Sequence, residues 1–145
     1  PHVSGACALA VSYYYGKDKR MGLTPDRLRA ALLSSARPFG SSLSSAYAGK
    51  MGAGMLDTWN FLRYMDFLGD VPDLSIKVGE SVTVALAEYF PSLQVVSYSV
   101  SDESVVGAAL DGEGLVLTGK AAGTATVTLS DGNALYKEFE ITVSK

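Results

Sequence analysis

The sequence predicts an α+β protein of two units, a helical unit over residues 1–69 and an all-β sandwich over residues 70–145. Apolar residues of the first unit recur at helical spacing, whereas those from Leu74 onward alternate with polar residues. The charge changes at the same point. Residues 1–69 carry eight Lys and Arg against four Asp and Glu, and residues 70–145 carry four against eleven. Both patterns place the boundary at a linker over residues 69–73.

The composition limits the classes of function. The 145 residues are 48% hydrophobic and 19% charged, so the chain can build a core and is not disordered by composition. No run approaches the roughly 18 apolar residues of a membrane span. The basic residues are scattered, which argues against nucleic-acid binding. A single cysteine, Cys7, excludes an internal disulfide, and we expect it to be a buried structural thiol.

Three helices are expected in the first unit. Residues 2–15 are small or apolar with little polar face, which predicts a buried helix. Thr24 as N-cap and Pro25 at the first helical position begin a second helix that ends near Ala36. A glycine-rich tight turn precedes a third helix over residues 55–68. Its apolar face is expected to be Met55, Trp59, Leu62, Met65 or Tyr64, and Leu68.

The second unit shows short alternating segments separated by turn signals such as Asp111-Gly112 and Ala122-Gly123. We expect about seven strands, the number of an immunoglobulin-like sandwich, with polar outer faces and aromatic anchors in the core. The alternating apolar positions are Ile76 and Val78; Val82, Val84 and Leu86; Val96, Tyr98 and Val100; Leu115 and Leu117; Ala125, Val127 and Leu129; and Phe139, Ile141 and Val143.

Three blocks of the helical unit follow one another in a recognisable order: PHVSGACAL at 1–9, LTPDRLRAALLSSA at 23–36, and GKMGAGMLD at 49–57. Together they resemble the region after the nucleophilic serine in the subtilisin family of serine proteases, which begins G-T-S-x-A-[ST]-P-H-V-[AS]-G. Cys7 and the longer, serine-rich segment after Ala36 depart from the family pattern.

The resemblance implies that this chain is the carboxyl-terminal part of a secreted endopeptidase. The nucleophile would lie four residues before Pro1, and the family's histidine, aspartate and oxyanion-hole asparagine further upstream, so we expect no catalytic residue in this chain. Pro1, His2, Val3 and Gly5 would form the structural motif that follows the nucleophile, in the helix that carries it. The start at Pro1, without a signal sequence, is expected to reflect processing or proteolysis.

His2 is expected to be a packing residue, because a general base needs a nucleophile and an orienting partner within reach. The partners implied by the resemblance are the upstream part of the chain's own catalytic domain and, in the full-length protein, a protein or peptide substrate. The helices alone would expose apolar side chains, so we expect cover from the sandwich, from self-association or from a retained upstream fragment. Those side chains are Val3, Leu9, Val11, Leu28, Leu32 and Trp59.

Four blocks of the second unit resemble a bacterial Ig-like module: VGESVTV at 78–84, YSVSDESVV at 98–106, AGTATVT at 122–128 and FEITV at 139–143. Such modules occur in secreted and cell-surface proteins, which implies that location and a glycan or surface partner. No cofactor is expected. Calcium stays an alternative, without EF-hand spacing. The loop carboxylates concerned are Asp70, Asp73, Asp102, Glu103, Asp111, Glu113 and Asp131.

The alternative reading comes from a different functional class. The chain is then a non-catalytic surface-binding or spacer module in which the helices only cap the sandwich, or a pseudoprotease whose serine has been replaced. The G-T-S-x-A sequence directly before Pro1 in the gene would separate these hypotheses from a live protease, because only the protease requires it.

Overall fold

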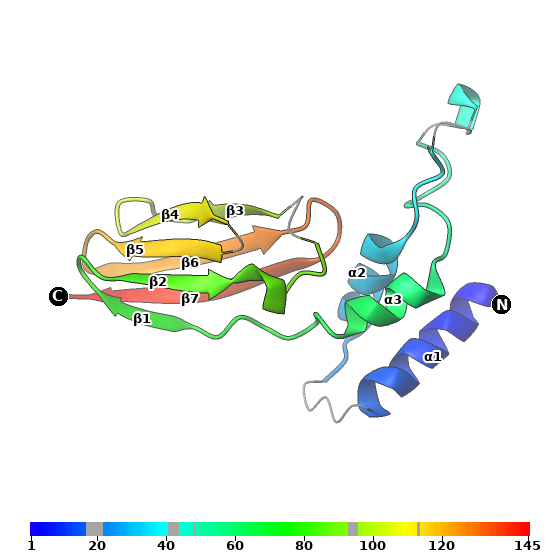
Figure 1. The fold of residues 1–145 in the computed structure, drawn as a ribbon, viewed down its shortest axis with the longest axis horizontal. Helices are drawn as coiled ribbons and strands as arrows, with labels where there is room; N and C mark the ends of the chain where they lie inside the picture. Colours follow the sequence, from blue (N-terminus) through cyan, green and yellow to red (C-terminus); the bar gives the residue numbers. More distant parts are fainter. Residues whose placement is uncertain (17–21, 41–43, 48, 93–95, 113) are drawn as a thin grey trace. The chain divides into compact units, whose positions relative to one another are not determined.

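The computed structural model describes residues 1–16, 22–40, 44–47, 49–92, 96–112 and 114–145 (Figure 1). The chain divides into two compact units, one of residues 1–68 with 133–135 and the other of residues 69–132 with 136–145. The first unit is helical and the second contains all seven strands of the described residues. That the helical unit is part of a catalytic domain stays a prediction.

In the helical unit, α3 packs against both α1 and α2. Two of the helices begin at capping side chains. The Thr24 hydroxyl accepts a hydrogen bond from the Arg27 amide at 3.2 Å, and the Asp57 carboxylate accepts one from the Asn60 amide at 3.0 Å. The cap predicted at Thr24 is therefore confirmed. The elements are α1 (His2–Gly16), α2 (Pro25–Ser35), the 3₁₀ turn η2 (Ser45–Tyr47) and α3 (Thr58–Met65).

An isolated antiparallel bridge joins the residue that follows the glycine-rich turn to a residue just after α2. Arg37 and Met55 exchange both backbone hydrogen bonds, at 2.9 and 2.8 Å. Gly54, next to this bridge, has a φ of 143°, and a Cβ there would overlap the Arg37 carbonyl. Only glycine fits both conditions. The predicted tight turn is confirmed by the turn conformation of residues 49–50 and 52–53, where Gly49 and Gly52 have φ of 73° and 71°.

The first helix is only partly buried in the described helical unit, and Val3 and Leu9 are exposed as expected for these helices without a cover. Along α1 only Ala6, Ala10 and Tyr14 are buried, a single stripe at a spacing of four residues. Val3 and Leu9 are 51% and 50% exposed. The described helical unit covers one side of the helix only, and the expected cover of its other side stays a prediction. Cys7 is likewise partly exposed rather than buried.

The third helix is shorter than predicted, and its predicted apolar face is confirmed in part, since Met65 and Leu68 are buried. Phe61 and Met65 are buried, whereas Trp59 is 75% exposed. Trp59 and Phe61 are two residues apart, and on an α-helix this spacing places them on different faces. Trp59 was expected on the apolar face and, without a cover, to be exposed. It is exposed, and the helix turns Phe61 inward instead.

The strands form two sheets, one in the order β1-β7-β6-β3 and the other in the order β2-β5-β4 (Figure 1). The pair β1–β7 is parallel, and every other pair is antiparallel. Strands two, five and four in one sheet and three, six and seven in the other reproduce the grouping of an immunoglobulin-type sandwich. The strands are β1 (Leu74–Lys77), β2 (Ser81–Ala85), β3 (Ser97–Val100), β4 (Val106–Asp111), β5 (Gly114–Gly119), β6 (Gly123–Ser130) and β7 (Tyr136–Ser144).

The core of the sandwich lies between the two sheets and follows the predicted alternation. Ala125, Val127 and Leu129 of β6 are all buried, as are Phe139 and Ile141 of β7. Val78, Leu86 and Val96 were expected to be strand residues, but they lie just outside the strands. Leu86 belongs instead to a 3₁₀ turn, η3 (Leu86–Glu88), that directly follows β2.

One strand, β4, was absent from the predicted alternation. Its residues Gly107, Ala108 and Ala109 are all small, so no contrast between large apolar and polar side chains marks the strand. It pairs with β5 over its whole length and forms an edge of its sheet. The surface along this edge contains the candidate functional site of the sandwich.

Candidate functional site

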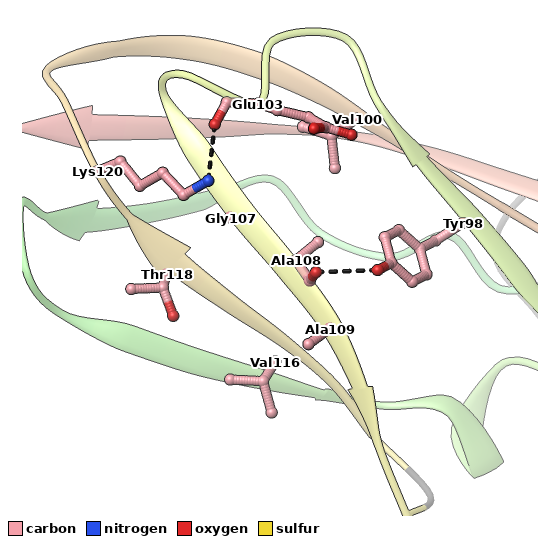
Figure 2. Close-up of a pocket in the computed structure, with 9 residues that line it drawn as sticks. All are labelled: Tyr98, Val100, Glu103, Gly107, Ala108, Ala109, Val116, Thr118 and Lys120. Atoms are coloured by element: carbon pink, nitrogen blue, oxygen red, sulfur yellow. Dashed lines mark hydrogen bonds between the residues drawn. The ribbon is translucent and has the colours of Figure 1, made fainter.

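A groove of about 470 Å³ lies on the sandwich along β4 and β5 (Figure 2). It is open to solvent and combines small, apolar and polar side chains, the mixture expected of a binding surface. Its lining residues are Tyr98, Val100, Glu103, Gly107, Ala108, Ala109, Val116, Thr118 and Lys120.

The strand register explains why the surface is hollow here. Ala108 of β4 pairs with Leu117 of β5, and Leu117 is fully buried, so this row faces the core. The adjacent rows, which include Gly107 and Ala109, therefore face outward. Gly107 has no side chain and Ala109 only a methyl group. The outer face of β4 is therefore recessed compared with a strand of larger residues.

Tyr98 forms one wall of the groove and connects the two sheets. It lies on β3, the edge strand of the opposite sheet, and its phenol donates a hydrogen bond to the Ala108 carbonyl at 2.9 Å (Figure 2). The Val105 carbonyl accepts from the Lys120 amide, so by the alternation of peptide groups along the strand the Ala108 carbonyl points away from β5. A side chain of one sheet therefore donates a hydrogen bond to an exposed carbonyl on the edge strand of the other sheet.

Lys120 forms the other wall. Its ammonium group donates to the backbone carbonyl of Glu103 at 3.0 Å (Figure 2). A Cβ on Gly107 would overlap Cε of the Lys120 side chain. Glycine at position 107 therefore lets the lysine stem lie across β4, and the lysine bridges β5 to the turn before β4.

That turn is fixed by Asp102. Its carboxylate accepts hydrogen bonds from the Ser104 amide at 2.9 Å and from the Ser104 hydroxyl at 2.6 Å. The hydrogen bond from the Ser104 side chain, and then that from its amide, lower the pKa of Asp102 below its ordinary value of 3.8. The carboxylate is therefore ionised at neutral pH and places negative charge beside the groove.

The lining residues hold no nucleophile with a base beside it. Thr118 is the only hydroxyl nucleophile of the serine or threonine type among them, and its oxygen lies 2.8 Å from the hydroxyl of Ser81. Histidine and cysteine are absent from the lining. The groove therefore offers its walls and backbone for binding, without a Ser-His or Cys-His pair among its lining residues.

The site residues expected from the sequence lie in the other unit. Pro1, His2, Val3 and Gly5 are all exposed at the amino-terminal end of α1. The Gly5 amide donates to the Pro1 carbonyl at 2.9 Å, the first hydrogen bond of the helix. A Cβ on Gly5 would meet nothing within 4 Å. The part of the helical unit that the structure describes therefore imposes no need for glycine there, and the role of these four residues stays a prediction.

Within the described ranges, no group of three or more His, Cys, Asp or Glu side chains could hold a metal ion. Of the carboxylates considered for calcium, Glu113 lies outside the described residues. In the same ranges, no helix combines the length and the apolar character needed to cross a membrane.

Comparison with known proteins leaves the family open. No family model matches the chain, and no curated protein matches it. Among solved structures it is similar to a chain in the crystal structure of the titin M10–obscurin-like 1 Ig complex. The identity is 14%, the match covers 50% of this chain and 86% of the other, and the TM-score is 0.29. The immunoglobulin-type assignment therefore depends on the strand pairing described above.

Sequence reasoning did not find the groove. Tyr98 was expected only as one of the alternating apolar residues of a strand. Lys120 was not singled out, and the small residues of β4 were not assigned to a strand. The signal available was the run Val106-Gly107-Ala108-Ala109-Leu110, five residues without a charge between two turns. Such a run is consistent with a strand, but it does not indicate which residues of the strand face the core.

Proposed function

We propose that this chain is the carboxyl-terminal part of a secreted subtilisin-like serine endopeptidase, with the sandwich as a module appended to the catalytic domain. The full-length protein hydrolyses peptide bonds, and its serine, histidine, aspartate and oxyanion-hole asparagine lie upstream of Pro1. The proposal is supported by the three ordered blocks of the helical unit and, above all, by the exposed apolar side of α1.

The helix α1 has no charged Lys, Arg, Asp or Glu side chain anywhere along its length. A helix that is apolar all round is normally buried. In the described helical unit only the stripe of Ala6, Ala10 and Tyr14 is covered, while Val3 and Leu9 are half exposed. Burial of one such side chain contributes about 1.5–3 kcal/mol. The resemblance supplies a cover, because the corresponding helix of subtilisin-like enzymes packs on their parallel sheet.

The proposed chemistry uses the amino-terminal end of the same helix. A serine just before α1 would lie at its positive end, where backbone N–H groups favour the negative charge that develops during acyl transfer. The residues from Pro1 to Gly5 would hold that end in place. They would not react themselves, so the chain by itself is expected to be inactive.

The test is fluorophosphonate labelling of the protein expressed from the full gene, with mass spectrometry to locate the adduct. The expected result is one labelled serine, four residues before Pro1, and loss of the label when that serine is changed to alanine. The chain of residues 1–145 alone should remain unlabelled. A folded full-length protein that takes no label would overturn the proposal.

A second candidate is a non-catalytic surface-binding module, which includes a pseudoprotease with its serine replaced. The observation that favours it is the groove on β4 and β5, which offers a binding surface without a nucleophile and base. Both candidates place the protein in the secreted or cell-surface fraction of a bacterium. An unlabelled full-length protein that still retains its sandwich ligand would favour the second candidate.

A further inference from the structure

We propose that the outer edge of β4 binds an extended peptide, which adds to the β2-β5-β4 sheet as a fourth strand and carries basic residues on either side of an apolar centre. This inference concerns the sandwich alone. It holds whether the helical unit belongs to a protease or to a binding protein.

The first observation is the open edge. Strand β4 is bonded to β5 on one side only, and the Ala108 carbonyl on its other side receives a side-chain hydroxyl rather than a strand. Because alternate residues of a strand direct their peptide groups the same way, Leu110 also directs its peptide group outward. From Val106 to Leu110 there is neither a charged residue nor a proline, which are devices that keep strand edges from pairing.

The second observation is the room beside that edge. A strand added to β4 would place alternate side chains over the outer face of the sheet, beside Gly107 and Ala109. The groove of about 470 Å³ is lined by both residues, and the Lys120 stem already lies over Gly107, so a side chain of the peptide would lie beside Ala109. Val116, the register partner of Ala109, gives the groove an apolar floor. A bulky apolar side chain at the centre of the peptide therefore finds both space and contact.

The third observation is the charge at both ends of the edge. Asp102 and Glu103 precede β4, Asp111 ends it, and all three are exposed. Val106 and Asp111 are five residues apart, which corresponds to about 17 Å of extended chain. Residues 70–145 as a whole carry four Lys and Arg against eleven Asp and Glu. Lys120 also lies at the Val106 end, but its ammonium already donates to the Glu103 carbonyl, and the three carboxylates outnumber it. A peptide with basic residues at its two ends matches this excess of negative charge, and an acidic peptide would be repelled.

Tyr98 controls access to the edge. Its phenol already occupies the Ala108 carbonyl, the acceptor at the middle of the exposed edge. An incoming strand must displace the phenol to complete its own hydrogen bonds. Removal of the hydroxyl should therefore strengthen peptide binding. A ligand that instead formed a hydrogen bond with the phenol would bind the variant without the hydroxyl more weakly.

The test uses the chain of residues 1–145 and a fluorescein-labelled peptide, Lys-Val-Thr-Tyr-Thr-Lys, measured by fluorescence anisotropy at low salt. Saturable binding is expected, and Tyr98→Phe should tighten it several-fold. Ala109→Lys, which puts a cation on the edge, should weaken it by about tenfold or more. The matched control is Thr83→Lys. Thr83 lies in the same cross-strand row as Ala109 and Val116 but at the opposite edge of the sheet, and this variant should leave binding unchanged.

Two altered peptides test strand addition without any change in the protein. A peptide N-methylated at every amide has no strand donor on either edge and should lose binding. A peptide with Glu in place of both Lys residues should bind about tenfold more weakly at low salt. Full binding of the N-methylated peptide, equal effects of Ala109→Lys and Thr83→Lys, or no saturable binding by either wild type or Tyr98→Phe would overturn the proposal.

A second copy of the chain is the competing occupant of the same edge. Analytical sedimentation of the Tyr98→Phe variant distinguishes pairing with a second copy from binding of the peptide. A concentration-dependent dimer that Ala109→Lys abolishes, without binding of the peptide, would assign the edge to self-pairing and overturn the peptide proposal. Fluorophosphonate labelling plays no part in this test, so its outcome is independent of whether the parent is a protease.

Discussion

The two units differ in how completely they bury their apolar side chains. In the sandwich, alternate residues of β5, β6 and β7 face one another, and Leu117, Val127 and Ile141 are fully buried within the unit itself. In the helical unit the buried stripe of α1 is mostly alanine, while Leu9 and Trp59 face solvent. The difference shows that the sandwich completes its own core, whereas the helical unit presents apolar surface that another element could cover.

The largest expected difference in stability is between a variant that loses a core side chain of the sandwich and one that loses an exposed side chain of α1. Phe139→Ala should destabilise the sandwich by about 3–5 kcal/mol, because it leaves a cavity among packed side chains. Leu9→Ala should change stability by no more than about 0.5 kcal/mol. Urea unfolding followed by circular dichroism, with fluorescence of the single tryptophan as reporter of the helical unit, measures both. A large loss for Leu9→Ala would mean that α1 is covered in solution.

The next effect lies within the helical unit and compares two glycines. Gly54→Ala should destabilise this unit by about 1–3 kcal/mol, because an L side chain is strained at its φ and would overlap the Arg37 carbonyl. Gly5→Ala should instead stabilise α1 by about 0.5–1 kcal/mol, since alanine is the better helix former and has open space there. The midpoint of the tryptophan transition reports both changes. Equal shifts for the two variants would contradict the tight turn.

A smaller effect is expected at the start of α2. Thr24→Ala removes the hydroxyl that caps the Arg27 amide and should cost about 1 kcal/mol of stability in the helical unit. Thr24→Ser keeps the hydroxyl and serves as the control. Thermal unfolding of the two variants should differ only in the helical transition, and a shift in the sandwich transition would argue against two separate units.

The smallest effect concerns pH and belongs to the sandwich. Because the pKa of Asp102 is lowered in the folded protein, its turn stabilises the sandwich fully above the ordinary value of 3.8. That contribution is lost as the pH falls through the lower, folded pKa. An NMR titration of the Asp102 carboxyl carbon should show the depressed value, and Ser104→Ala should return it toward 3.8. A titration unchanged by Ser104→Ala would exclude the hydrogen bonds as the cause.

The sequence predicted best where one physical rule determined the structure. Two-residue alternation located β6 and β7, since large apolar residues can face only one side of a strand. Thr24 and Pro25 located the start of α2, because few residue pairs satisfy the unpaired amides of a helix end. In both cases the deciding contacts are local or repeat regularly along the chain.

The sequence predicted poorly where the outcome depends on a partner element. Whether Trp59 or Phe61 faces inward is decided by what packs on α3, and both positions fit a helix equally well. The groove is harder still, because it arises from side chains that β4 lacks and from a tyrosine on β3 that reaches across from the other sheet. No local pattern encodes a contact between the edges of two sheets.

The parallel pairing of β1 with β7 has a mechanical consequence. The first and last strands of the sandwich run in the same direction, with Leu74 opposite Ile141 and Lys77 opposite Ser144. The chain therefore enters the sandwich at one end of this ladder and leaves at the other. Tension applied through the two ends loads the ladder lengthwise, so its hydrogen bonds resist shear together instead of opening one after another. The sandwich is thus suited to carry force along a chain anchored at one end and pulled at the other.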